Sequence, residues 1–272
     1  METNIAKKPI GVFDSGIGGL TVVRALAKRL PRERIIYFGD TARVPYGPKS
    51  TEVVKQYAVQ DAAFLMTKDV KMIVVACNTV SAVAIDEVKK RFALPVLGVI
   101  QPGARAAVAS TKNRKVGVIG TVGTIASRAY TDAIHNLDSS IEVTAQACPL
   151  FVPLAEEGLA DHPAAELLAR DYLKPLIDQH IDTLVLGCTH YPILKHTIEK
   201  VVGLGIRLID SAEATAADVE RLLTEKGLLS SDGRSPLHEF FVSDFPHRFR
   251  EIGERFFGEP LHSVTKVEGF PV

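Results

Sequence analysis

Short apolar runs alternate with longer amphipathic stretches along the chain, and this alternation limits the folds that it can adopt. Runs of four or five apolar residues are typical of buried strands, whereas the stretches between them repeat their apolar residues with helical spacing. Parallel strands need a long crossover connection, which a helix usually provides, so this order favours a parallel sheet. In the first part of the chain, the predicted elements are strands at Ile10–Phe13, Ile35–Phe38 and Met72–Ala76, and helices at Gly19–Leu30, Ser50–Lys68 and Ser81–Arg91.

The same alternation starts again after Pro95–Gly103, a segment rich in proline and glycine where we expect the chain to cross into a second domain. The predicted elements that follow are strands at Lys115–Ile119, Ile141–Ala145 and Thr183–Leu186 and a helix at Ala164–Gln179. A second crossing is expected near Gly203–Arg207. After it we expect a strand at Glu239–Val242 and a helix that places Phe249, Ile252 and Phe256 on one core-facing side.

The two parts resemble each other, which indicates an internal duplication. In both, a strand runs into a polar turn, and similar intervals separate Asp14 from Cys77 and Thr121 from Cys188. The length of 272 residues also suits about two domains of ~150 residues. We predict an α/β protein with two pseudo-symmetric, doubly wound parallel-sheet domains that face each other across a cleft. Residues 1–98 and 207–272 would form the first domain, and residues 99–206 the second.

Two cysteines occupy matching places in the two parts. Cys77 follows the apolar run Met72–Ala76 and Cys188 follows Thr183–Gly187, and polar residues that suit a helix start come next in both cases. We therefore expect each thiol at the carboxyl end of a strand, beside a helix N-terminus that lowers its pKa. Two such thiols facing one small cavity would form an acid/base pair, with one group on each side of a substrate carbon.

Other interpretations of these cysteines stay open at this point. Cys77, Cys188 and His190 could belong to a zinc site, although their spacing is poor and no fourth ligand is evident. Cys188 and His190 could form a nucleophile pair for acyl transfer, which would leave Cys77 unexplained. A regulatory disulfide, or two buried structural thiols, are further alternatives. Cys148 lies away from a polar turn, so we interpret it as structural.

Two loops at predicted strand ends are candidate binding segments. The turn Asp14–Gly19 is glycine-rich and opens a helix, but a dinucleotide fingerprint fails because Thr21 stands where the last glycine is required. A small amino acid fits this turn better, with Asp14 near its ammonium group and backbone N–H groups near its carboxylate. The polar loop Asp40–Pro48 lies where open α/β sheets bind ligands, although a surface turn would show the same residues.

The composition of the chain limits the binding partners and the cellular compartment that we expect for it. Thirty-two basic residues balance thirty-two acidic ones, so the chain has no electrostatic signature of nucleic-acid or membrane binding. Three cysteines are too few and too scattered for a disulfide framework. Met1–Pro9 lacks the apolar core of a signal peptide, and Met72–Ile85 is too short and polar to span a bilayer. We expect a cytoplasmic protein that keeps its thiols free.

Five motifs together resemble bacterial, cofactor-independent glutamate racemases of the aspartate/glutamate racemase superfamily. These motifs are Gly11–Val22, Gly39–Gly47, Ala76–Thr79, Gly187–Pro192 and Phe241–Asp244. The resemblance implies two α/β domains across an active site and the interconversion of L- and D-glutamate without cofactor or metal. It also implies that D-glutamate supplies peptidoglycan synthesis, and that the protein is a homodimer.

The resemblance also implies roles for individual residues. Cys77 would act on the α-proton of D-glutamate and Cys188 on that of L-glutamate, with Asp14 and His190 assisting the neighbouring thiols. Glu156 is a further assisting candidate, although adjacent Glu157 makes that alignment ambiguous. The positions that match substrate contacts are Asp14, Ser15, Tyr46, Gly47, Asn78, Thr79, Thr189 and His190. The alternatives are a racemase acting on aspartate, a Cys–His acyl-transfer enzyme, and a two-domain protein that binds an amino acid without reaction.

Overall fold

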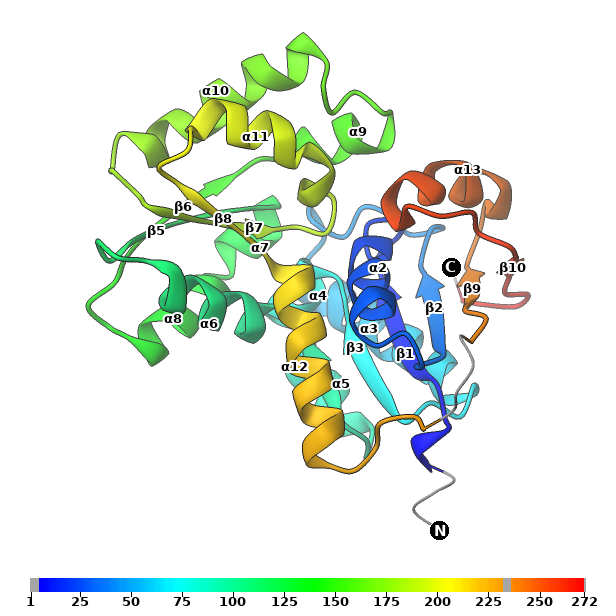
Figure 1. Cartoon of the computed structure of the whole chain (residues 1–272). Helices are drawn as coiled ribbons and strands as arrows, with labels where there is room; N and C mark the ends of the chain where they lie inside the picture. The colour runs from blue at the N-terminus through cyan, green and yellow to red at the C-terminus, as the bar shows by residue number, and fades with distance from the viewer. Residues whose placement is uncertain (1–4, 232–235, 272) are drawn as a thin grey trace.

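The computed structural model describes residues 5–231 and 236–271 and contains two parallel β-sheets (Figure 1). The first sheet has the order β10-β9-β2-β1-β3-β4, and its strands are β1 (Ile10–Asp14), β2 (Ile35–Gly39), β3 (Met72–Val75), β4 (Val96–Gly98), β9 (Glu239–Val242) and β10 (Val264–Lys266). The second sheet has the order β6-β5-β7-β8, and its strands are β5 (Lys115–Gly120), β6 (Glu142–Ala147), β7 (Thr183–Gly187) and β8 (Arg207–Asp210). Part of the N-terminal segment interpreted above, Met1–Asn4, lies outside the described residues.

Both sheets contain the same arrangement of four strands. β2-β1-β3-β4 in the first sheet corresponds to β6-β5-β7-β8 in the second, strand for strand in chain order, and the pairings are parallel. β3 and β7, which precede Cys77 and Cys188, are therefore equivalent strands. The predicted fold of two parallel-sheet α/β domains with an internal repeat is confirmed.

Helices cover both faces of each sheet, as expected for a doubly wound fold. In the first domain the helices are α2 (Leu20–Arg29), α3 (Thr51–Met66), α4 (Asn78–Val83), α5 (Ile85–Arg91) and α13 (Pro246–Phe257). Side chains of α2 and α13 share one core with strand residues such as Val12, whereas α3 and α4 pack on the opposite face with Phe13. The predicted stripe of Phe249, Ile252 and Phe256 is buried in the first of these cores.

The second domain is covered in the same way. Its helices are α6 (Ile100–Ser110), α7 (Val122–Ala126), α8 (Ala129–Leu137), α9 (Phe151–Glu156), α10 (Pro163–Ile177), the 3₁₀ turn η1 (Tyr191–Leu194) and α11 (Lys195–Val202). The long helix α12 (Ser211–Glu225) packs against α6 of the second domain and α2 of the first, and it crosses between them in Figure 1. Among the helices of the described residues, none is long and apolar enough to cross a bilayer.

Several element boundaries differ from the sequence-based expectation. The single helix expected at Ser81–Arg91 is two helices that start directly after Cys77 and break at Ala84. The segment expected as a first crossing contains β4 and the beginning of α6. β8 pairs with β7, so residues 207–210 continue the second sheet, whereas we expected residue 207 to begin the return to the first domain. That return follows α12. The missed strands are three or four residues long, too short for a clear periodicity.

Candidate active site

A small cavity of about 60 Å³ lies where the carboxyl ends of the two sheets face each other. Its walls come from the segments that follow β1, β2, β3, β5 and β7, together with α9. Both Cys77 and Cys188 line it. In full, the lining residues are Ser15, Gly16, Val44, Pro45, Tyr46, Gly47, Cys77, Asn78, Thr79, Thr121, Val152, Glu156, Cys188, Thr189 and His190.

Cys77 is the N-cap residue of α4, and its buried thiol lies 3.7 Å from the hydroxyl oxygen of Ser15. Burial and, second to it, the negative charge of Asp14 together raise the pKa of this thiol to about 12, although a hydrogen bond from the backbone N–H of Val80 opposes the rise. We expected the helix N-terminus to lower the pKa, and that expectation is wrong for this structure. Desolvation of the thiolate outweighs the six-residue helix, so Cys77 is a protonated thiol at neutral pH.

Cys188 forms a chain with His190 and Glu156. Its sulfur lies 3.8 Å from Nδ1 of His190, and Nε2 of the same ring lies 2.9 Å from Oε1 of Glu156. Burial alone would lower the pKa of His190, but Cys188 and Glu156 outweigh burial and raise it to about 10. Burial would likewise raise the pKa of Glu156, and the contact with His190 lowers it instead. The imidazole is therefore a cation at neutral pH, held between the sulfur and the carboxylate.

The surroundings of Cys188 differ from those that the sequence predicts. No α-helix begins directly after it, because His190 caps the short 3₁₀ turn η1 and α11 starts only at Lys195. We expected a helix N-terminus beside the thiol of Cys188, and the structure has the charged ring of His190 beside it instead. The three cysteines are free thiols.

The structure separates Glu156 from Glu157. Glu156 lines the cavity and contacts His190, whereas Glu157 forms a surface ion pair with Arg248 at 3.1 Å. Arg255 of α13 donates a hydrogen bond to the backbone carbonyl of Glu156, which fixes the end of α9. Of the two glutamates, only Glu156 contacts His190, the residue beside the sulfur of Cys188.

Asp14 is the candidate site residue that does not line the cavity. It ends β1 and is fully buried, and its Oδ2 atom accepts the N–H of Gly16 at 3.1 Å. Burial raises its pKa, while the charge of His190 and backbone N–H groups of the turn oppose that rise. The structure therefore places Asp14 behind Ser15 and Gly16, where its charge acts on Cys77 from within the protein.

Tyr46 and Gly47 reach the cavity from the loop between β2 and α3. The hydroxyl group of Tyr46 points into the first domain, where it contacts Asp40 and Asp61. These contacts hold the ring in place at the cavity wall. The carbonyl oxygen of Gly47 accepts the N–H of Gly123 at 3.0 Å across the domain boundary. A Cβ atom on Gly47 would lie 3.0 Å from the Cβ atom of Thr121, so the loop is in tight contact with the second domain.

Asn78 and Thr79 follow Cys77 and also bind the second domain. The hydroxyl group of Tyr130 donates to Oδ1 of Asn78 at 2.7 Å, while Nδ2 of Asn78 is buried without a partner among the described residues. The hydroxyl group of Thr79 lies 3.0 Å from that of Thr121 and 3.3 Å from that of Thr124. The free amide N–H group is a donor available to a bound anion.

Thr189 and His190 contact the glycine-rich turn of the first domain. The hydroxyl group of Thr21 donates to the carbonyl oxygen of Thr189 at 3.0 Å. A Cβ atom on Gly18 would lie 2.2 Å from Oγ1 of Thr189, which leaves no room for any side chain. This glycine allows the domains to touch, a different role from the anion cradle that the turn suggested.

Apart from Asp14, the candidate residues line one cavity. Gly16, Val44 and Pro45 also line it and lie in the two candidate binding segments, whereas sequence reasoning missed Thr121 and Val152 as site residues. Thr121 had a usable signal, because the internal repeat places it after β5 as Ser15 lies after β1. Phe256 was interpreted only as core, yet its ring packs edge-on against His190 at 5.3 Å between centroids. No sequence pattern relates α13 to this histidine.

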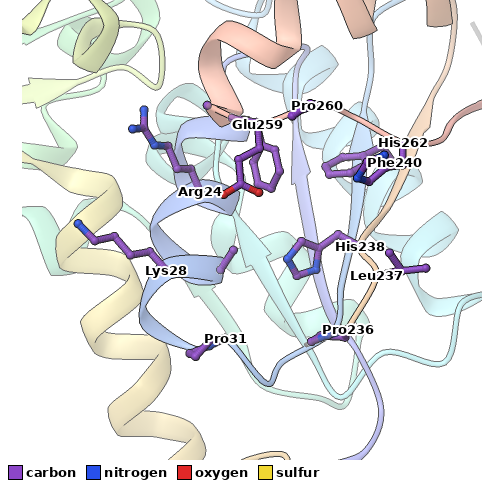
Figure 2. A pocket seen from close by; sticks show the side chains of 13 residues that line it. Arg24, Lys28, Pro31, Pro236, Leu237, His238, Phe240, Glu259, Pro260 and His262 are labelled. Atoms are coloured by element: carbon purple, nitrogen blue, oxygen red, sulfur yellow. The ribbon is translucent and has the colours of Figure 1, made fainter. Parts of the chain in front are cut away.

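A larger cavity of about 680 Å³ lies elsewhere, between α2, the start of β9 and the segment after α13 (Figure 2). Arg24, Lys28, His238 and Glu259 line it together with Phe240, and neither Cys77 nor Cys188 reaches it. Among the described residues, no group of three or more His, Cys, Asp or Glu side chains is arranged to hold a metal ion. The paired thiols thus identify the smaller cavity as the candidate active site.

Comparison with known proteins assigns this fold and site to a class. The chain belongs to the Asp/Glu/hydantoin racemase family, whose model matches residues 10–219, and it is therefore an isomerase of the racemase type. Glutamate racemases are among the relatives that it matches over nearly its full length, at 50–54% identity. One from Chlorobium phaeobacteroides is 54% identical over 263 residues, which cover 96% of this chain and 97% of the relative.

Solved structures of glutamate racemases share the whole fold. The enzyme from Francisella tularensis, solved in complex with D-glutamate, superimposes with a TM-score of 0.91 at 44% identity and covers 97% of this chain and 98% of its own. An isoform from Bacillus anthracis gives a TM-score of 0.93 at 43% identity and covers 96% and 98%. The similarity therefore includes both domains and the cleft between them.

Proposed function

We propose that this chain interconverts L-glutamate and D-glutamate without a cofactor, using Cys77 and Cys188 as the two acid/base groups. The observation that carries the proposal is that both thiols line one cavity from equivalent positions, after the equivalent strands β3 and β7. The glutamate racemases among the relatives, and D-glutamate in the Francisella tularensis structure, support glutamate as the substrate.

Racemisation requires proton removal from one face of Cα and proton delivery to the other. With L-glutamate, the sulfur of Cys188 takes the α-proton, so that the C–H bond breaks and its electron pair stays on carbon. Cys77 then gives its thiol proton to the opposite face and is left as a thiolate. The reverse sequence converts D-glutamate and restores the first protonation state. The raised pKa of Cys77 suits this role, because an acid must hold its proton until the carbanion forms.

His190 and Glu156 support the Cys188 side of this reaction. The imidazolium lies beside the sulfur and compensates negative charge on it, while Glu156 holds the ring in orientation. Asp14 supports the Cys77 side of the reaction, because its negative charge raises the pKa of Cys77 and so keeps the thiol protonated until the carbanion forms. The two thiols therefore have different partners, although they come from equivalent strands.

Substrate recognition is assigned to the polar groups that remain on the cavity wall. The buried Nδ2 group of Asn78 can donate to the α-carboxylate, where negative charge grows as the carbanion forms. Hydroxyl groups of Ser15, Thr79 and Thr189 offer further donors and acceptors. The small volume of the cavity keeps water away from the reacting carbon, which strengthens each of these contacts.

The first test is incubation of the purified protein with L-glutamate in deuterated water, with the α-proton signal and D-glutamate both followed. Deuterium at Cα together with D-glutamate is the expected result. Parallel incubation with L-aspartate distinguishes the related racemase, and a thioester on Cys188 after a quench would support acyl transfer instead. Binding of glutamate without exchange would replace the proposal with an amino-acid-binding protein.

We further propose a cytoplasmic homodimer that supplies D-glutamate to peptidoglycan synthesis. The free thiols suit a reducing compartment, and the product suits a cell wall built with D-amino acids. Native mass measurement tests the dimer. Depletion of the protein in its host, with rescue by added D-glutamate, tests the cell-wall role.

A further inference from the structure

Asp61 is a buried carboxyl group in the middle of α3, on the side of the helix that faces the core. It lies on the same face as Ala58, Ala62 and Leu65, and its side chain is completely shielded from solvent. Its contacts are Arg43 and Tyr46, both in the loop that lines the active-site cavity. A buried ionised carboxylate is costly unless donors and a positive charge compensate it.

The hydrogen bonds around Asp40 identify that residue as the ionised carboxylate of the cluster. Its Oδ1 atom accepts from the hydroxyl group of Ser243 at 2.8 Å, and this hydroxyl oxygen itself accepts the N–H of Ala42, so its proton points at Asp40. Its Oδ2 atom accepts from Nε of Arg43 at 2.5 Å and also contacts the phenol of Tyr46. Both oxygens of Asp40 are thus acceptors.

The phenol of Tyr46 has one proton but two carboxyl neighbours. It contacts Oδ2 of Asp40 and lies 3.1 Å from Oδ2 of Asp61. If its proton goes to Asp40, which gathers three donors, the contact with Asp61 is a hydrogen bond only when Asp61 donates it. Oδ1 of Asp61 accepts from Arg43 at 3.0 Å, which leaves Oδ2 as the protonated oxygen.

Charge balance leads to the same result. Within the described part of the chain, Arg43 is the only cation in contact with either carboxyl group, and it is itself buried against the ring of Tyr57. One positive charge compensates one carboxylate, so a second buried carboxyl group has to be neutral. Burial together with the charge of Asp40 raises the pKa of Asp61 well above its usual range, with Asp14 adding to the rise and Arg43 and Tyr46 opposing it.

We propose that Asp61 is a neutral carboxylic acid at physiological pH, and that the hydrogen bond it donates to Tyr46 positions the cavity loop. Because Tyr46 precedes Gly47, whose carbonyl oxygen binds Gly123 of the second domain, the proton on Asp61 helps to set one wall of the active site. Asp61 is a positioning residue, since it does not line the cavity. The protonation of Asp61 rests on hydrogen-bond geometry and charge balance, whereas its effect on turnover rests on the proposed function.

The decisive measurement is the infrared difference spectrum between the wild-type protein and Asp61→Asn. A protonated carboxyl group has a C=O stretch that a carboxylate lacks. We expect this band at neutral pH in the wild type and its absence from Asp61→Asn. Asp14 and Asp210, whose pKa values are also raised, cancel in the difference. A difference spectrum without the band would overturn the proposal.

Unfolding and kinetics test the consequence of this proton. Asn reproduces a neutral acid, since its amide group can donate to Tyr46 and its carbonyl oxygen can accept from Arg43. A carboxyl group with a raised folded pKa loses stability as pH rises above its unfolded pKa of ~3.9. The melting temperature of Asp61→Asn minus that of the wild type should therefore increase as pH rises. A difference that stays constant with pH would contradict the proposal.

For turnover, Asp61→Ala should lower kcat/KM roughly tenfold by removing the hydrogen bond to Tyr46, while Asp61→Asn keeps most of it. Equal losses in both variants would contradict the positioning role. A wild-type protein that fails to racemise glutamate would remove the proposed function, yet the infrared band and the unfolding curves would still decide the protonation state.

Discussion

Gly18 lies so close to His190 that a Cβ atom built on it would be 2.4 Å from the ring atom Nδ1, the same atom that faces the sulfur of Cys188. The contact joins the glycine-rich turn after β1 in the first domain to the segment after β7 in the second domain, which carries Cys188 and His190. It also makes the position of His190 depend on how closely the domains approach each other.

Replacing Gly18 by alanine should therefore damage catalysis more than folding. The methyl group has to displace Thr189 or His190 by about 1 Å, a misplacement that can cost ~10²-fold in rate. Turnover and melting temperature, measured on the same samples, test this prediction. Gly205→Ala is the matched control, because nothing lies within 4 Å of a Cβ atom there. Full activity in Gly18→Ala would show that the domains adjust without cost.

Replacing either catalytic thiol should abolish efficient racemisation. Cys77→Ser and Cys188→Ser each remove one of the two proton carriers, because a serine hydroxyl is a far weaker acid than a thiol. Slow exchange of the α-proton of a single enantiomer should remain, since one thiol still faces one side of Cα. Racemisation and deuterium exchange, followed separately for each enantiomer, distinguish these outcomes.

Cys148→Ala is the control for the thiol variants. Cys148 is buried in an apolar core and does not line the cavity, and among the described residues its sulfur makes one hydrogen-bond contact, with the backbone carbonyl oxygen of Gln146 at 3.7 Å. Its loss should leave turnover in both directions unchanged. Near-normal racemisation by Cys77→Ser or Cys188→Ser would reject the two-thiol assignment.

Glu156→Gln should lower the pKa of His190 from about 10, because the carboxylate is one of the groups that raise it. A histidine with a raised folded pKa contributes stability that is complete below its unfolded pKa of ~6.5 and is lost as pH rises through the folded value. The variant should lose this stability at lower pH than the wild type. NMR titration of the His190 ring and unfolding across a pH series measure both effects.

Glu157→Gln provides the matched comparison for this experiment. Glu157 is adjacent in sequence but pairs with Arg248 on the surface, where both side chains are 61% exposed. Neither the titration of His190 nor the pH dependence of unfolding should change. If the two variants behave alike, the contact between His190 and Glu156 does not set the charge of the ring.

Asp14→Asn should lower the pKa of Cys77 below about 12, because the charge of Asp14 is a cause of that value second only to burial. The thiolate absorbance of Cys77 can be titrated in a background of Cys148→Ala and Cys188→Ser. In the otherwise wild-type protein, the same change should impair turnover more than stability. The exposed Asp171→Asn serves as control, and a collapse of the melting temperature with normal specific activity would assign Asp14 to folding instead.

The sequence predicted the architecture well because the central strands are buried on both faces. β1, β3 and β7 consist entirely of buried residues, and such uninterrupted apolar runs are easily recognised. The start of α3 was equally readable, because the helix was expected from Ser50, and the side chain of this residue accepts the N–H of Val53 as the N-cap. β4 and β8 at the sheet edges were missed because three or four half-buried residues give little pattern.

The candidate site was only partly predictable, and the limit was electrostatic. Local sequence places Cys77 at a helix start, but it does not show that Asp14 lies nearby in the folded protein or that burial outweighs the helix. The charge on His190 depends on Cys188 and on Glu156, which lies thirty-four residues earlier in the chain. Such properties arise from packing between distant segments, which periodicity does not encode.

The repeated strand order gives both thiols equivalent positions but unequal neighbours, with Ser15 beside one and an imidazolium beside the other. Enantiomers have the same free energy in water, so the equilibrium constant of any racemisation is unity. The Haldane relation then requires kcat/KM to be equal in the two directions. The asymmetry around Cys77 and Cys188 can therefore change kcat only together with KM, so an enantiomer that binds more tightly also turns over more slowly.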